Sequence, residues 1–248
     1  MIKTLYRNEL EKLFYRKKYL VFLILDILSG VVIAVAQMLT NLFTEGAISA
    51  STLFDGMLMN GFSLYMALFI PLMAVLGCAD LFSGECHDRS LRMLIQRPVA
   101  RWKIYLGKVL AIYTLCVIYV VAHFASLVLI KLGFAHTWNG TLFALGAYAL
   151  DLIPIFAVVA FFAFLHQLVD APGSATALSL VFYLLLLAVG RYVDLGTGLI
   201  FTEYITWHTM WIGNALPLLV LLPKIGILLG STVVFYCAGF ELFDRKEI

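Results

Sequence analysis

Charge is scarce in this sequence, and long stretches carry none, which excludes most soluble folds. Only 13% of the 248 residues are charged, whereas 63% are hydrophobic. A soluble domain is nearer to about a quarter charged and half apolar. Apolar runs of about 20 residues are long enough to cross the hydrocarbon core of a bilayer. The composition therefore predicts an all-α polytopic membrane protein.

Motifs that bind nucleotides or hydrolyse bonds are absent from the sequence. No G-x-x-x-x-G-K-[ST] phosphate loop exists; the nearest fragment, 106–109, has Val109 in the Ser/Thr position and Trp102 in the position of the first Gly. H-E-x-x-H, G-x-S-x-G and the dinucleotide fingerprint are also missing. The residues outside the apolar runs are too few for an ordinary ATPase domain. Active work would therefore draw its energy from a separate subunit or an ion gradient.

Patterns for metal binding and for a cleaved leader are missing too. The four cysteines form no C-x-x-C pair and no His/Cys cluster has zinc spacing, so we expect reduced thiols and no metal site. The first apolar run is longer than the apolar region of a signal peptide, and no small-residue cleavage site follows it. We expect this run to remain as the first spanning helix.

Six apolar segments predict six transmembrane helices within a single domain, 19–248. We place the spans at about 19–39, 57–81, 107–130, 141–165, 173–192 and 225–243. Residues 1–18 alternate apolar and basic side chains at helical spacing, which predicts an amphipathic interfacial helix. A merely solvated start to the first span is the alternative.

The segment 193–224 is too polar for a spanning helix and too aromatic for an aqueous loop. We expect an outer re-entrant or interfacial helical hairpin that leans on other helices, because exposed backbone is costly at membrane depth. Pro217 and Pro223 are expected to break any long helix there.

Lys and Arg residues are distributed unevenly between the two sides of the predicted bundle. The first 18 residues carry six of them, 80–108 carries six and the tail carries two, against Lys131, Arg191 and Lys224 on the other side. Positively charged loops stay in the cytoplasm. The distribution therefore places both termini and the stretch 80–108 in the cytoplasm.

The longest polar interruption runs from Asp80 to Lys108, with a coupling stretch at 82–103. Pro98 disfavours helix at the residue before it, so we expect a short helix from Glu85 to Ile95 across the membrane surface. This helix would offer charges of both signs to a soluble partner, and a loop that binds only lipid headgroups is the alternative. The candidate coupling residues are Glu85, Asp88, Arg89, Leu91, Arg92 and Arg97.

The stretch from Ser83 to Lys108 resembles the cytoplasmic loop of permease subunits of ATP-binding-cassette (ABC) transporters of the type-2 exporter family. In that family an acidic residue ends the second span, and a coupling helix then leads to L-L-x-x-P-V-S-R-x-x-x-x-x-G-K. This sequence has Glu85, then LIQRPVAR at 94–101, then GK at 107–108. The basic start, the six spans and the outer hairpin also resemble the family, so the resemblance covers the whole chain.

One position departs from the family pattern, which often reads E-x-x-x-G-[TS]. Arg89 holds the place of that glycine. A left-handed or close-approach backbone is therefore less expected there.

The resemblance implies a permease in a bacterial cell membrane that works with a second permease copy or a close paralogue. Two copies of a separate ATPase would bind ATP and magnesium, which leaves this chain without a cofactor or a catalytic residue. Substrate would pass between protomers and would be amphipathic or hydrophobic: a peptide antibiotic, a drug or a lipid-like molecule. No nucleic acid is an expected partner.

Ionisable residues inside the spans are costly and form a second candidate site. Counting about 1.5 Å per residue from the inner ends of the spans places His123 about 24 Å and Asp151 about 21 Å up, so we expect these two to pair. Asp26 lies too low for either. Together with Asn60, they either line a substrate path or fix helix packing.

Two alternatives to an exporter remain at this point. One is an intramembrane enzyme, for which His123 with Asp151 is the only candidate pair. The other is a membrane anchor that is coupled to an ATPase and transmits force without moving a substrate.

Overall fold

The computed structural model describes residues 2–43, 58–59, 61–91, 99–192, 198, 200–211 and 217–246. Within these residues the regular structure is helical, and six helices are long and apolar enough to cross a membrane. The prediction of an all-α polytopic protein is confirmed.

The chain begins with two helices that meet at Arg16. α1 spans Ile2–Tyr15 and α2 spans Lys17–Phe43. Leu5, Glu9 and Leu13 follow one another at intervals of four residues and form the buried face of α1. This face packs against α8. The placement of α1 on a membrane surface stays a prediction.

The second membrane helix is continuous from Phe62 to His87 but contains two π-helical turns. It consists of α4 (Phe62–Leu64), η1 (Tyr65–Phe69), α5 (Ile70–Cys78), η2 (Ala79–Ser83) and α6 (Gly84–His87). In a π-turn each N–H reaches the carbonyl five residues back, so one turn holds an extra residue.

Pro71 follows the first π-turn and leaves a carbonyl unpaired. Proline has no N–H, so the carbonyl four residues earlier, that of Ala67, loses its helical partner. The Tyr183 hydroxyl donates a hydrogen bond of 2.7 Å to this oxygen. A proline in one helix thereby fixes the position of another.

The other long helices are α8 (Arg101–Ala135), α9 (Thr141–Leu168), α10 (Pro172–Tyr192) and α11 (Leu218–Asp244). Pro217 is the N-cap of α11. Pro223 lies inside this helix, so the expectation that it breaks the helix was wrong. It is close enough to the N-terminus that only one early carbonyl, that of Leu219, loses its helical hydrogen bond.

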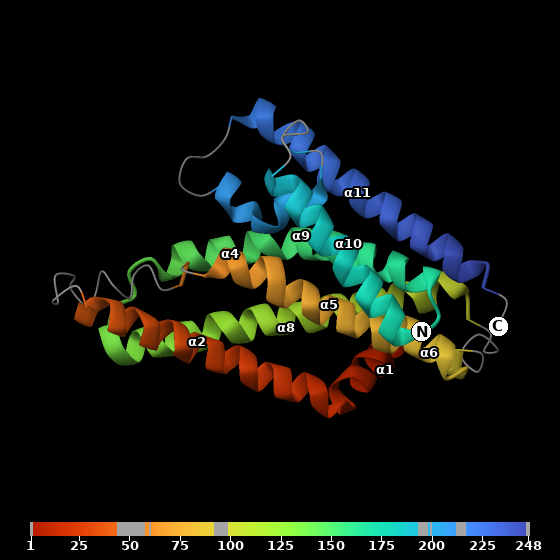
Figure 1. Cartoon of the computed structure of the whole chain (residues 1–248), viewed down its shortest axis with the longest axis horizontal. Helices are drawn as coiled ribbons and strands as arrows, with labels where there is room; N and C mark the ends of the chain where they lie inside the picture. The colour runs from red at the N-terminus through yellow and green to blue at the C-terminus, as the bar shows by residue number, and fades with distance from the viewer. Residues whose placement is uncertain are drawn as a thin grey trace.

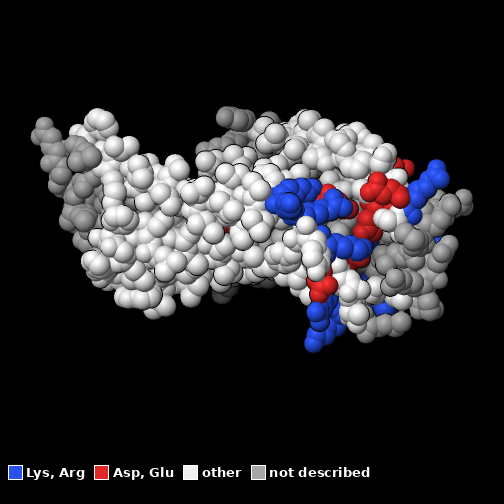
Figure 2. Space-filling view, turned by 90° about the horizontal axis from the view of Figure 1, so that it is seen from below, with Lys and Arg blue, Asp and Glu red and all other residues white. Residues whose placement is uncertain are grey.

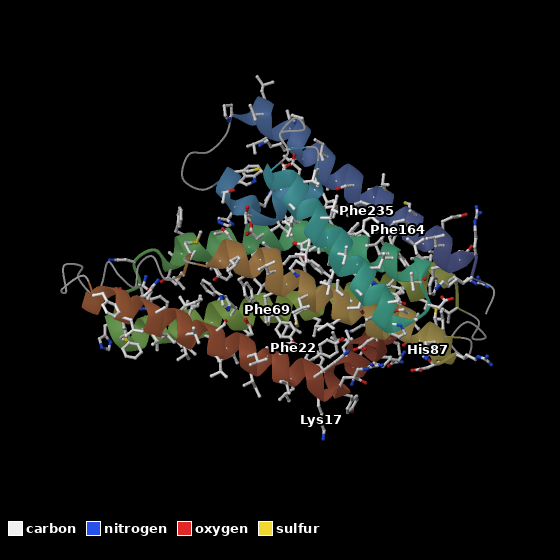
Figure 3. The ribbon with its side chains drawn as sticks, in the orientation of Figure 1. Lys17, Phe22, Phe69, His87, Phe164 and Phe235 are labelled. Atoms are coloured by element: carbon white, nitrogen blue, oxygen red, sulfur yellow. The ribbon has the colours of Figure 1, made fainter. Side chains whose placement is uncertain are left out.

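α9 occupies the centre of the bundle, and both termini lie at the same end of it, beside α6 (Figure 1). α9 packs against α5, α8, α10 and α11, and α2 packs on the far side of α8. Ala157, Ala160 and Ala163 are fully buried along α9, and small side chains let membrane helices approach closely. Phe164 on α9 and Phe235 on α11 meet with ring centroids 6.1 Å apart (Figure 3).

A short 3₁₀ segment, η3 (Phe201–Met210), precedes α11 and is kinked at Thr206. It packs against α9 and α10. These contacts agree with the expectation that the segment before the last span packs against other helices. Its re-entrant placement stays a prediction, and residues 193–197, 199 and 212–216 lie outside the described residues.

Candidate functional site

Charged side chains gather at one end of the molecule, and the rest of the visible surface is nearly free of them (Figure 2). This end holds α1, α6 and both termini (Figure 1). Here three buried carboxylates, in two groups, meet basic residues of the chain start and of α8.

The first group, which we call the Glu85 cluster, consists of Glu9, Lys12, Glu85 and Lys108. The fully buried Lys108 ammonium donates to Glu85 Oε2 at 2.6 Å and to Glu9 Oε2 at 3.1 Å. Lys12 donates to the other oxygen of each carboxylate, at 2.8 Å in both cases. Two cations and two anions thus link α1, α6 and α8.

The second group, the Asp80 cluster, consists of Arg16, Lys18, Tyr19 and Asp80. Arg16 lies 2.6 Å and Lys18 2.7 Å from oxygens of the Asp80 carboxylate. The buried Tyr19 hydroxyl donates to Asp80 Oδ2 at 2.6 Å. These contacts join the start of α2 to the second membrane helix.

The π-turn η2 explains how Asp80 and Glu85 can face the same basic segment. Five residues along a regular α-helix turn a side chain by about 140°, to a different face. In a π-turn, residues five apart lie nearly in line. Gly84 permits this turn, because a Cβ there would lie 2.8 Å from the Ala79 carbonyl oxygen.

The carboxylates of the Glu85 cluster hold the Lys12 ammonium in its ionised state. Burial lowers the pKa of Lys12, but the Glu9 and Glu85 carboxylates outweigh burial, and the pKa of this ammonium is raised above 10.5. A buried ion pair is favourable only when its partners are fully hydrogen-bonded. Four charges of balanced sign meet that condition and fix the helices at this end.

The predicted coupling residues fall into three groups in the structure. Glu85 and Leu91 are buried, whereas Asp88 and Arg89 are exposed. Arg92 and Arg97 lie outside the described residues. Among the described coupling residues, those that a partner could contact therefore lie in the turn His87–Arg89, beside the Glu85 cluster. The role of all six residues in coupling stays a prediction.

The expected helix from Glu85 to Ile95 is interrupted within its described part. α6 ends at His87, and Asp88 and Arg89 form a turn before Ser90 becomes helical again. Arg89 is left-handed, with φ 56°. The expectation against such a backbone at this position was wrong. The chain has to leave the second membrane helix here, and this reversal requires the left-handed residue even without glycine.

Within the bundle, the expected pairing of His123 with Asp151 was wrong. His123 Nδ1 lies 3.1 Å from Asp26, and His208 Nδ1 lies 2.6 Å from Asp151. The backbone N–H of His208 also donates to Asp151 at 2.6 Å. The two Asp–His pairs thus join α2 to α8 and α9 to η3.

The position of α8 explains why Asp26 reaches His123. The Tyr119 hydroxyl donates to the Tyr19 carbonyl at 2.6 Å, so these two residues share a level. Tyr119 is 18 residues into α8, about 27 Å, whereas Tyr19 is only two residues into α2. α8 therefore starts far below α2, and a depth counted from residue 107 misplaced His123.

Aromatic rings connect the two Asp–His pairs. His123 stacks on Tyr65 at 3.9 Å between centroids and lies 6.4 Å from Tyr148. Tyr148 stacks on Phe62 at 3.7 Å, and Phe62 lies 5.2 Å from His208. This row is densely packed, which favours the interpretation that the polar pairs fix helix packing.

Some predicted features lie outside what the structure describes, and some residues were missed. Asn60 is outside the described residues. No group of three His, Cys, Asp or Glu side chains in the described part could hold a metal ion. Sequence reasoning missed Glu9 as a site residue. Its place between Leu5 and Leu13 on the apolar face of α1 was the available signal.

Comparison with known proteins agrees with this architecture. A family model described as "ABC-2 family transporter protein" matches residues 3–248. No curated protein matches the chain.

Proposed function

Because the chain belongs to the ABC-2 transporter family and is a multi-pass permease subunit, we propose that it exports an amphipathic or hydrophobic substrate. Members of this family work with a separate ABC ATPase subunit. In the proposal two ATPase copies serve two permease copies, and ATP with magnesium binds only to the ATPase. Peptide antibiotics, drugs and lipid-like molecules are the candidate substrates.

The ionic contacts behind the exposed turn are the observation that carries this proposal. In it, the ATPase docks on the turn His87–Arg89 and pushes it when ATP binds. α6 then carries Glu85, which Lys108 ties to α8 and Lys12 ties to α1. Asp80 ties the same helix to α2. A push on one turn would therefore move four helices as a unit.

The test changes the exposed turn and leaves the buried cluster intact. Arg89→Glu in the full-length protein should weaken pull-down of the partner ATPase at least tenfold and abolish substrate-stimulated ATP hydrolysis. Lys17→Glu is the matched control, because Lys17 is an exposed cation at the same end that points away from the bundle (Figure 3). Glu85→Arg and Leu91→Asp are less suitable, since both side chains are buried.

Two results would count against the proposal. Unchanged pull-down and ATP hydrolysis in Arg89→Glu would show that the turn is not the docking site. ATP hydrolysis without movement of any substrate, across a broad panel in reconstituted vesicles, would favour the force-transmitting membrane anchor.

A further inference from the structure

A cavity of about 970 Å³ opens between the start of the second membrane helix, α10 and η3. This volume is at the upper end of the range that holds a drug-sized molecule, roughly 300–1,000 Å³. The cavity lies apart from the Glu85 and Asp80 clusters, and none of its lining residues belongs to the Asp–His pairs.

The walls of the cavity are held by hydrogen bonds between helices. The Tyr183 hydroxyl of α10 donates to the Ala67 carbonyl, which belongs to the cavity wall, at 2.7 Å. The Thr202 hydroxyl of η3 donates to the Leu186 carbonyl of α10 at 3.5 Å. Because all three walls are connected, the space between them is a formed site in the folded protein.

The lining is mostly apolar, with one ionisable group. Leu64, Leu68, Leu187 and Ile205 are the larger apolar side chains of the lining, and hydroxyl side chains lie among them. Glu203 is the only ionisable side chain among the described lining residues. A ligand that fits this surface has an apolar body and one polar end.

Gly190 makes room for the carboxylate of Glu203. A Cβ on Gly190 would lie 3.1 Å from Glu203 Cγ and 3.3 Å from its Oε1. The Glu203 side chain therefore lies directly against the α10 backbone. A Cβ at position 190 would therefore force the Glu203 side chain to shift by a few tenths of an ångström.

Glu203 differs from the buried carboxylates of the bundle. Asp26, Asp80, Glu85 and Asp151 each contact a basic side chain or a histidine within 3.1 Å. Glu203 forms no ion pair with any side chain in the described part of the chain. A carboxylate beside apolar walls attracts a cation more strongly than one in water does, because the surrounding dielectric is lower.

We propose that this cavity binds lipophilic cations, with the Glu203 carboxylate as their counter-ion and the leucine side chains around their apolar body. The inference rests on the proposed function in one respect: it names the charge class of the exported substrate. Binding itself needs neither ATP nor the ATPase, so it can be measured on the permease alone.

The test uses tetraphenylphosphonium, a rigid apolar cation, in equilibrium dialysis against the full-length protein in detergent. Glu203→Gln keeps the shape of the side chain and should weaken binding at least tenfold. Glu241→Gln is the matched control, since this exposed glutamate on α11 is not in the cavity wall, and it should bind as the wild type does. Gly190→Ala should weaken binding by displacing the carboxylate, and Leu187→Trp should weaken it by filling the space.

The anion tetraphenylborate has nearly the same shape and, dialysed by itself in a separate experiment, should not bind at this site. Equal phosphonium binding by Glu203→Gln and the wild type would overturn the proposal, and so would binding of tetraphenylborate as tight as that of the phosphonium. Intact binding without transport in vesicles that contain the ATPase would count against the export function and leave the cation site standing. Loss of binding in Glu203→Gln together with normal pull-down of the ATPase would support the site independently of coupling.

Discussion

Replacing Lys108 by methionine tests whether the Glu85 cluster holds the charged end of the bundle together. Methionine keeps the length and apolar stem of the side chain but removes the ammonium. That ammonium is fully buried and lies 2.6 Å from Glu85 and 3.1 Å from Glu9. The substitution therefore leaves two buried carboxylates that share a single cation, Lys12.

The expected loss follows from the geometry. Removing one partner of a buried ion pair destabilises a protein by about 3–5 kcal/mol. Lys12 still contacts both carboxylates, but its side chain is 43% exposed and compensates only in part. We expect a loss near the lower limit, about 3 kcal/mol, which is roughly a 150-fold shift in the unfolding equilibrium.

The measurement is unfolding of the purified protein by sodium dodecyl sulfate in mixed micelles. Lys103→Met is the matched control, because Lys103 lies on the same helix and forms no ion pair among the described residues; it should change the stability by less than about 0.5 kcal/mol. The double variant Glu85→Gln/Lys108→Met should lose at least about 1 kcal/mol less than the sum of its single variants, since the two groups interact directly.

Equal stability of the Lys108→Met and Lys103→Met variants would refute this reasoning. Strict additivity of Glu85→Gln and Lys108→Met would refute the contact between them. Either result would also remove the physical link between the exposed turn and α8.

The structure supports three further predictions. Arg89→Gly should stabilise the protein by about 1 kcal/mol in the same unfolding assay, because glycine adopts the left-handed backbone without steric strain, whereas Arg89→Ala should give no gain. Asp151→Ala should destabilise it by about 2 kcal/mol, since the His208 amide loses its acceptor; a loss below about 0.5 kcal/mol would contradict the contact. The stability difference between the wild type and Lys12→Met should stay constant from about pH 7 to 9 and fall only above about pH 10.5, because the raised pKa of Lys12 keeps its contribution complete below that value.

The fold was predictable from the sequence because hydropathy decides which segments enter lipid. The residue at which the third membrane helix begins was not predictable, and the reason is Lys108. A lysine normally marks a membrane boundary, and the sequence therefore predicts a span that begins beside Lys108, at about residue 107. In the structure Glu9 and Glu85 neutralise this lysine, and α8 continues to Arg101. Depths counted from residue 107 instead of Arg101 therefore predict the wrong partner for His123.

The candidate site was only partly predictable, for a similar reason. The family resemblance directed attention to Glu85 and Arg89, but a sequence pattern does not report burial. A π-turn has no compositional signal either, because it differs from an α-turn only in its hydrogen-bond register. The common orientation of Asp80 and Glu85 therefore became visible only in three dimensions.

The π-turn η2 has an evolutionary consequence. A π-turn is geometrically an α-helix into which one residue has been inserted. Loss of a single residue between Ala79 and Ser83 would restore a regular helix and leave the two carboxylates four residues apart, still on one face, because four residues of an α-helix make one full turn and about 40°. Relatives that carry a one-residue gap here can therefore keep both carboxylates facing the basic segment. A regular helix of unchanged length would instead turn Glu85 by about 140° from Asp80, so at the present spacing the two carboxylates depend on the π-turn for their common orientation.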